Sequence, residues 1–295
     1  GCSLFDKKKE DPKIETANVP YEARESDEAP RSRVLVLPFL DEKSTRAQKV
    51  AEESRRIVVA ELQKTRRFVV VGNQDFPHDP KKYLNEQGDY DLEAISKMAS
   101  TIGVAAIIEG KILEVKAKKV GDQVGLIRQI RARVEATVRV RMYSARNGKE
   151  ILNEVRTASI EDSTTRVAEY SYSDRFLEED PTLVKLAVRE ALMGMIRSLA
   201  ASVEKLSWEG RVAMVAGERI FINAGRLSGL QVGDILKIAE DGEEVYDPET
   251  GRFIGHAPGR MKGTVELVSY FGKDGAIAVV HSGSGFKEND RVQLY

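Results

Sequence analysis

Apolar runs without any polar position mark the first predicted strands. Residues 34–40 read VLVLPFL, and a run of this length is typical of a strand covered on both faces of a sheet. Pro38 is expected to end this strand or to place it at an edge, because proline cannot donate to a strand ladder. Similar runs at residues 68–72 and 104–108 predict two more buried strands.

Segments with helical spacing lie between these strands and after them. Apolar positions recur at intervals of three and four from Ala47 to Leu62, with charged residues on the opposite face, which predicts an amphipathic helix. Asp91 is placed to cap a second, shorter helix. A third helix is expected to begin at Pro181 behind the cap residue Asp180, and to continue without a break for about 26 residues.

Residues 130–142 alternate between apolar and polar positions. This period of two predicts one long strand with a dry face and a wet face. Asn147 and Gly148 are expected to supply both positive-φ positions of a tight hairpin turn, and residues 150–160 to return as the partner strand. The wet face carries a row of four arginines: Arg131, Arg133, Arg139 and Arg141.

The arginine row allows two interpretations. It is either an ordinary solvated sheet face or a surface that docks an acidic partner or a neighbouring subunit, since arginine suits interface ion pairs. We carry these four arginines forward as a candidate interaction surface.

Short strands punctuated by glycine and turn residues fill the chain from residue 207 onward. Six runs, near residues 212–215, 220–222, 235–238, 265–268, 277–280 and 292–294, predict a small barrel. Residues 247–251, with the sequence DPETG, predict a tight turn. The expected fold class is therefore α+β or α/β, a mixed sheet with helices packed on it, followed by a small all-β, barrel-like domain.

The N-terminal segment is polar and poor in apolar residues, so it cannot bury enough surface to offset its ordering entropy. We therefore divide the chain into residues 1–32, a lipidated N-terminus with a disordered tether, residues 33–206, a mixed α/β domain, and residues 207–295, a β domain.

Composition adds one specific feature, the single cysteine of the 295 residues. It excludes an internal disulfide and a zinc site built on several cysteines. Cys2 stands between Gly1 and Ser3, a setting typical of the lipidated cysteine of bacterial lipoproteins. Ser3 favours the outer membrane, whereas an aspartate there would favour retention at the inner membrane. The alternative is a cysteine without a role beside a cloning remnant.

Charge and motifs argue against nucleic acid and against catalysis. The net charge is -1, so no whole-molecule field attracts nucleic acid. Three histidines are widely separated, and neither a phosphate loop nor a nucleophile elbow is present. The acidic residues near position 241 lack the spacing of a twelve-residue calcium loop. We expect no enzyme activity, no cofactor and no metal.

Two family resemblances are visible. Residues 33–203 resemble the CsgG domain of the curli secretion lipoprotein, at VLVLPF (34–39), RFVVV (67–71), GKI (110–112) and NGKEIL (147–152). The C-terminal segment is similar to the C-terminal domain of the flagellar H-ring protein FlgT, at IFINAG (220–225), GLQVGD (229–234) and DPETG (247–251). The resemblances imply a periplasmic envelope assembly factor, with envelope or flagellar proteins as partners and a homo-oligomeric ring as one arrangement.

Two functions follow from the resemblance. The first is a lipid-anchored scaffold in a flagellar basal body or a related envelope machine. The second is a subunit of a CsgG-type outer-membrane secretion channel, whose membrane strands would come from residues 115–130 and 159–180. Both segments are rich in charge, and Lys or Arg on a lipid-facing strand costs about 2–4 kcal/mol at mid-membrane, which favours the scaffold.

Overall fold

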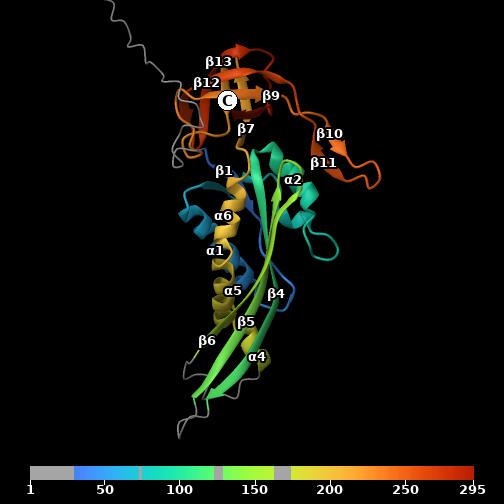
Figure 1. Cartoon of the computed structure of the whole chain (residues 1–295), viewed down its shortest axis with the longest axis vertical. Coiled ribbons are helices and arrows are strands. Elements are labelled where there is room, and N and C mark those ends of the chain that lie inside the picture. The colour runs from blue at the N-terminus through green and yellow to red at the C-terminus, as the bar shows by residue number, and fades with distance from the viewer. Residues whose placement is uncertain (1–29, 73–74, 123–128, 163–173) are drawn as a thin grey trace, which may run out of the picture.

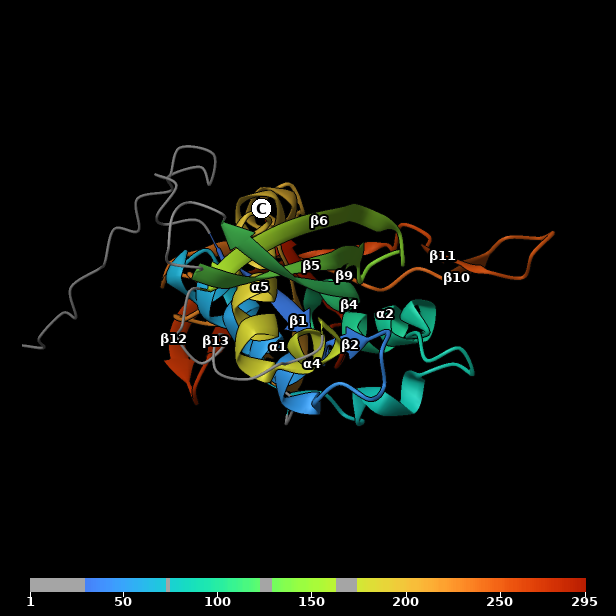
Figure 2. The ribbon, with the colours of Figure 1, turned by 90° about the horizontal axis from the view of Figure 1, so that it is seen from below.

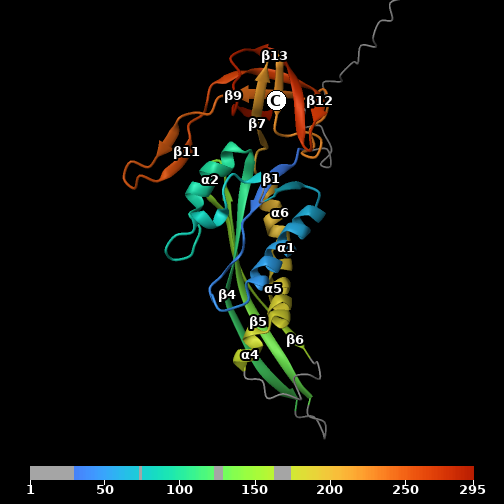
Figure 3. The same cartoon turned by 180° about the vertical axis from the view of Figure 1, so that it is seen from behind.

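A mixed sheet with helices and a closed barrel lie end to end along the long axis of the molecule (Figure 1). The structure is a computed structural model, and it describes residues 30–72, 75–122, 129–162 and 174–295. Cys2 and nearly all of the predicted tether lie outside these residues. The barrel is at one end, and a long hairpin reaches the opposite end, so the two are the most distant described parts of the chain (Figures 1 and 3).

The sheet has the strand order β3-β1-β4-β5-β6, with β2 paired to β4. Its strands are β1 (Ser32–Val36), β2 (Leu40–Asp41), β3 (Phe68–Val71), β4 (Val104–Asp122), β5 (Gln129–Ser144) and β6 (Glu150–Asp162). β1 is parallel to β3 and β4, whereas β4, β5 and β6 are successively antiparallel. As predicted, the first strand ends before Pro38, and the chain resumes pairing at β2.

Helices cover both faces of the sheet near β1. Val34 and Val36 pack in one core with helices α1 (Gln48–Lys64), α5 (Pro181–Met193) and α6 (Ile196–Glu204). Leu35 and Leu37 pack in a second core with helix α2 (Leu92–Thr101), on the opposite face (Figure 3). The short helices η4 (Pro80–Tyr83) and α4 (Asp174–Glu179) complete this domain. Coverage on both faces explains why residues 34–37 are apolar at every position.

The strand predicted at residues 104–108 is much longer than expected. β4 continues to Asp122 and pairs with β5 along its whole length, so the two form the long hairpin seen in Figure 1. A bulge between Ile112 and Glu114 shifts the alternation by one residue, so that Ile112 and then Val115 both face the core. Without this bulge the charged residues that follow would point into the core.

The dry and wet faces predicted for residues 130–142 are confirmed for the described side chains. The dry side chains from Ala132 to Met142 are fully buried, and α5 covers them (Figure 2). Asp91 caps α2, as predicted, by accepting a hydrogen bond from the backbone N–H of Ala94 at 3.1 Å.

Two local predictions were wrong. Only Gly148 has positive φ in the turn after β5, because the connection is a wider loop closed by Ser144 and Lys149 rather than a two-residue turn. The predicted third helix is broken into α5 and α6 at Gly194. Arg156 of β6 packs on Gly194, where a Cβ atom would lie 2.2 Å from its guanidinium, so the absence of a side chain at Gly194 makes room for Arg156.

The barrel closes in the order β12-β13-β8-β7-β14-β9. Its strands are β7 (Glu209–Ala216), β8 (Arg219–Ile222), β9 (Ile235–Ala239), β12 (Met261–Phe271), β13 (Gly275–Gly283) and β14 (Arg291–Leu294). All six predicted runs form strands of this barrel. A two-stranded ribbon of β10 (Glu244–Tyr246) and β11 (Phe253–His256) projects from it and was not predicted, although the turn at residues 247–251 was.

The close packing of the Phe39 ring on Gly110 can be tested by substitution. A Cβ atom at Gly110 would lie 2.1 Å from the Phe39 ring, so the ring occupies the space that any side chain would need. We expect Gly110→Ala to lower the free energy of unfolding by about 1–3 kcal/mol through overpacking. Phe39→Leu in the same chain should recover part of this loss, and urea denaturation of both single variants and the double variant measures the coupling. If the changes in unfolding free energy of the two single variants simply add in the double variant, the contact is contradicted.

Candidate functional site

Arg139 and Arg141, half of the predicted row, bind a buried carboxylate. Glu109 of β4 has a side chain only 1% exposed, and it accepts hydrogen bonds from Arg141 Nη2 at 2.6 Å and from Arg139 Nη2 at 3.4 Å. Burial opposes the charge on Arg141, but the attraction of Glu109 outweighs burial and raises the pKa of Arg141. This triad is an internal part of the fold, because a buried carboxylate needs such partners.

Lys111 extends the same polar cluster toward the loop before α2. Its Nζ atom lies 2.6 Å from Glu42 and 3.0 Å from Asp89. The hydrogen bond from Lys111 holds the pKa of Asp89 below its usual range. Burial and a hydrogen bond to Glu150 raise the pKa of Tyr143, which lies beside Arg141, so its phenol stays neutral at neutral pH.

Arg131 and Arg133, the other half of the row, lie toward the free end of the hairpin. Arg131 is 42% exposed and lies 3.9 Å from Glu161, and Arg133 Nη2 lies 3.4 Å from the Ser159 hydroxyl. A hollow of about 380 Å³ beside Arg133 is lined by Lys116, Ala117, Lys118, Glu135 and Glu178. The structure therefore splits the row into a half that is paired with the buried Glu109 and a more accessible half.

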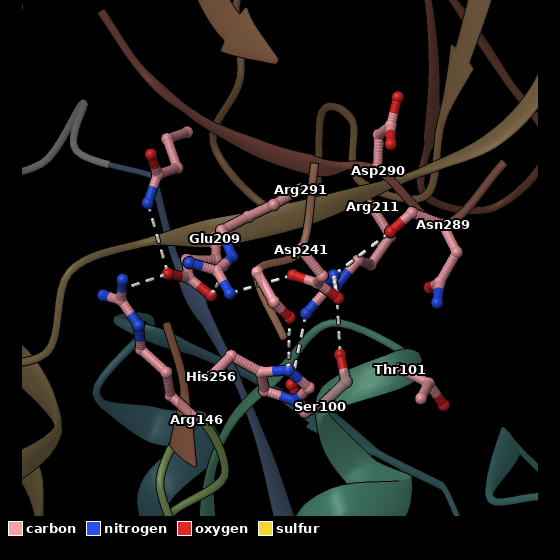
Figure 4. A network of polar contacts seen from close by, with 12 residues as sticks. Ser100, Thr101, Arg146, Glu209, Arg211, Asp241, His256, Asn289, Asp290 and Arg291 are labelled. Carbon is pink, nitrogen blue, oxygen red and sulfur yellow. Dashed lines mark hydrogen bonds and ion pairs between the residues drawn. The ribbon is translucent and has the colours of Figure 1, made fainter. Parts of the chain in front are cut away.

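A second polar cluster joins the sheet domain to the barrel, and Arg211 of β7 is its centre (Figure 4). The Arg211 side chain is 4% exposed. It reaches out of the barrel and donates from Nε to the Ser100 carbonyl and from Nη2 to the Ser100 hydroxyl, each at 3.1 Å. Its Nη1 atom donates to Asp241 at 2.5 Å and to the Asn289 carbonyl at 3.1 Å.

Further ion pairs surround Arg211. Asp241 also accepts from Arg291 Nη2 at 2.8 Å, so one carboxylate bridges two buried arginines of neighbouring strands. Glu209 lies 3.7 Å from Arg291 Nε and 3.2 Å from Nη1 of Arg146, which belongs to the loop after β5 (Figure 4). The barrel is thereby tied to the hairpin strand that carries the arginine row.

Asn223 and the projecting ribbon add contacts to α2. Asn223 accepts from the backbone N–H of Arg211 at 2.8 Å and donates to the Ile102 carbonyl at 3.3 Å. On the ribbon, the backbone N–H of Phe253 donates to Glu93 at 2.6 Å, and Lys97 lies 2.8 Å from Glu244. The ribbon contacts hold it against the first turn and the middle of α2.

Asp274 closes the junction on the side where β1 begins. It lies 3.3 Å from Arg33 Nη2, and it accepts from the backbone N–H groups of Gly225 and Ser228 and from the Ser228 hydroxyl. Burial lowers the pKa of Arg33, although Asp274 opposes this effect. The two domains are therefore joined by polar contacts in two separate regions, around Arg211 and around Asp274, and this arrangement resists rotation of one domain against the other.

The side chains of these clusters hold parts of the fold in position. Within the described ranges, no three His, Cys, Asp or Glu side chains gather as metal ligands would. The histidines of the barrel domain stay apart: His256 Nδ1 lies 3.2 Å from the Gly242 carbonyl, and His281 Nδ1 lies 3.1 Å from the Thr264 hydroxyl. No described helix is both long enough and apolar enough to cross a bilayer.

The arginines of the junction were not singled out from the sequence. Arg211 and Arg291 lie in short strands of mixed composition, and nothing in the local pattern distinguishes a buried arginine from an exposed one. Each of them directly precedes an apolar run, but so does the exposed Arg219, so this position gave no signal of burial.

Comparison with known proteins assigns no family. No family model matches the sequence, and no curated protein matches it. A solved structure of a hypothetical protein from Chlamydia trachomatis is similar at 15% identity, with a TM-score of 0.38, over 59% of this chain and 98% of that chain.

Bacterial lipoproteins are among the other similar structures. A lipoprotein from Neisseria meningitidis is 12% identical, with a TM-score of 0.32, over 58% of this chain and 99% of that chain. The C-terminal domain of LpoB from Salmonella enterica is 14% identical, with a TM-score of 0.29, over 44% of this chain and 83% of that chain. TM-scores of this size place the chain in no family.

Replacing Arg211 tests whether the junction is held by this side chain. We expect Arg211→Met to lower the free energy of unfolding by about 3–5 kcal/mol, because Asp241 and the Ser100 carbonyl lose a buried charged partner. Arg219→Met, at an exposed position of the neighbouring strand, is the matched control and should change stability by less than about 0.5 kcal/mol. Urea denaturation measures both, and equal stability of the two variants would contradict the role of Arg211.

The two halves of the arginine row should respond differently to charge reversal. Arg139→Glu with Arg141→Glu brings three carboxylates together around Glu109, and we expect a loss of stability of at least about 3 kcal/mol. Arg131→Glu with Arg133→Glu changes accessible side chains and should leave stability within about 1 kcal/mol. Only the variant of Arg131 and Arg133 is expected to stay folded, so docking is tested with this variant. Analytical ultracentrifugation measures its self-association, and partner capture measures its binding to other proteins. Unchanged assembly of this variant would show that the accessible half is a solvated surface.

Proposed function

We propose that this protein is a non-catalytic envelope lipoprotein that acts as a scaffold or assembly factor. Cys2 carries the lipid anchor and holds the protein on the periplasmic side of the outer membrane. The single observation that carries the proposal is the junction around Arg211, which ties the two domains together and leaves distant surfaces at the two ends of the molecule. A body of this kind sets the distance between the components that it joins.

More specifically, we propose that the protein acts in a flagellar basal body or a related envelope machine. It rests on the resemblance of residues 33–203 to the CsgG domain and of the C-terminal segment to FlgT. Two of the motifs quoted for the resemblance have structural roles here. Gly110 makes room for Phe39, and Asn223 joins the barrel to α2. Partners are then other envelope or flagellar proteins, with no nucleic acid, cofactor or metal required.

A ring of identical subunits is compatible with the sheet. β3 and β6 are its two edge strands, and β6 extends over 13 residues. Val155 of β6 is 54% exposed. Edge strands have unpaired backbone groups, and an interface that joins two different edges generates rings when its rotation closes.

The secretion channel is the weaker candidate. In the described part of the first proposed membrane segment, Val115 and Ala117 face the domain core, and α4 and α5 lie on this side of the hairpin. The opposite face carries Lys116, Lys118 and Arg133. A lipid-facing strand needs an apolar outer face, and here the apolar face is used for packing. Part of the second segment, residues 163–173, lies outside the described residues.

Replacement of Cys2 tests the anchor. The chain is expressed behind a lipoprotein signal sequence, and outer-membrane, inner-membrane and periplasmic fractions are compared. We expect Cys2→Ala to move the protein to the periplasmic fraction, because no acyl chains remain to hold it. Ser3→Asp keeps the cysteine and should move the protein to the inner membrane. A Cys2→Ala protein that stays in the outer-membrane fraction would rule out the anchor.

A further inference from the structure

The outer surface of the barrel exposes apolar side chains close to one another. Phe271 at the end of β12 is 39% exposed, and Met214 of β7 is 43% exposed. Phe221 of β8 pairs with Met214 across the strands, and its ring meets the Phe271 ring edge to face at 5.3 Å between centroids. Ile220 and Ile222 on either side of Phe221 fill the barrel core, so Phe221 lies on the outside.

Leu227 lies in the loop that follows β8. It is 44% exposed and precedes Ser228. Asp274 binds Ser228, and it stands in the turn that directly follows Phe271. We call Met214, Phe221, Leu227 and Phe271 the barrel patch.

Cations border the barrel patch. Arg226 is exposed, and its guanidinium lies 4.7 Å from the centre of the Tyr270 ring. Lys273 is exposed in the same turn as Asp274. Asp274, the carboxylate between these cations, is 10% exposed and already engaged by Arg33. The edge of the patch is therefore positive, and it combines exposed aromatic and aliphatic side chains with lysine and arginine, as membrane-surface sites do.

The chain enters the described structure at this edge. The backbone N–H of Arg31 donates to the Ser228 carbonyl at 2.5 Å, so the end of the predicted tether lies beside Leu227. The sequence predicts a tether over residues 1–32, and a flexible chain of about thirty residues spans roughly 30 Å on average, comparable to the size of a small domain. An anchor at Cys2 thus holds the barrel patch within reach of the lipid surface.

We propose that the barrel patch lies on the lipid surface in which Cys2 is anchored. The apolar side chains enter the headgroup region, and Arg226 and Lys273 contact anionic headgroups. This inference rests on the proposed function, because it uses the anchor at Cys2. It adds a membrane contact of the barrel, whereas the free end of the β4–β5 hairpin lies at the other end of the molecule (Figures 1 and 3).

The single tryptophan of the chain provides the test. Trp208 is 6% exposed in the barrel core, so energy transfer from it to dansyl-labelled headgroups reports how close the barrel is to the membrane. The lipidated full chain is reconstituted on vesicles of phosphatidylethanolamine and phosphatidylglycerol. Leu227→Glu with Phe271→Glu places two charges in the patch and should lower the transfer by about twofold or more, as the barrel leaves the surface.

Val245→Glu with Ile254→Glu is the matched control. These side chains are 39% and 48% exposed on the ribbon, and their replacement should leave the transfer unchanged. Arg226→Glu with Lys273→Glu is a second patch variant that alters only exposed charges. It should also lower the transfer, and salt should lower the transfer of the unmodified protein, because headgroup attraction is screened.

Cosedimentation with the vesicles separates the two proposals. If the lipidated protein cosediments and neither patch variant alters energy transfer, the anchor stands and the membrane role of the patch is overturned. A patch that instead captures a protein partner would give this same result. If the lipidated protein does not cosediment, the anchor itself fails, and the inference fails with it. Near-ultraviolet circular dichroism confirms that each variant is folded.

Discussion

A buried guanidinium holds the two domains together. Arginine keeps its charge in proteins, so a guanidinium that leaves water must find a carboxylate and enough acceptors for its N–H groups. Arg211 finds them only where the domains meet: Asp241 and the Asn289 carbonyl come from the barrel domain, and both oxygens of Ser100 come from α2. Rotation of one domain would remove acceptors from a charge that is almost fully buried. The requirements of this side chain are therefore one of the constraints on the relative position of the domains.

The need of buried charges for partners also explains the rest of the junction. Asp241 is shared by Arg211 and Arg291, and Asp274 is shared by Arg33 and the turn around Ser228. Each carboxylate serves two segments that are distant in sequence, so neither segment can shift alone. A rigid body suits a scaffold, because a flexible link between two docking surfaces would spread their separation over many values. The membrane contact proposed for the barrel patch extends this reasoning, since the barrel is tied to the hairpin through the same junction.

Arginine has different roles at different points of the long hairpin. Arg139 and Arg141 neutralise Glu109, which is inaccessible to solvent, whereas Arg131 and Arg133 lie on an accessible face beside a hollow. The residue type and the alternation are the same in both pairs. The difference comes from the opposite strand, which places Glu109 beside Arg141 and Lys118 beside Arg133. It also comes from the loop before α2, where Asp89 binds the neighbouring Lys111.

Periodicity alone determined most of the elements of this protein. Continuous runs predicted β1 and β3, alternation predicted the faces of β5, and Asp91 marked the start of α2, because these signals depend on local backbone and burial requirements. Local signals did not predict the length of β4, whose alternation shifts at Ile112, or the helix break at Gly194, where Arg156 of β6 packs. The tertiary structure alone decided which arginines are buried. Arg211 and Arg219 look alike in sequence, and only the approach of α2 gives the first of them the partners that a buried charge requires.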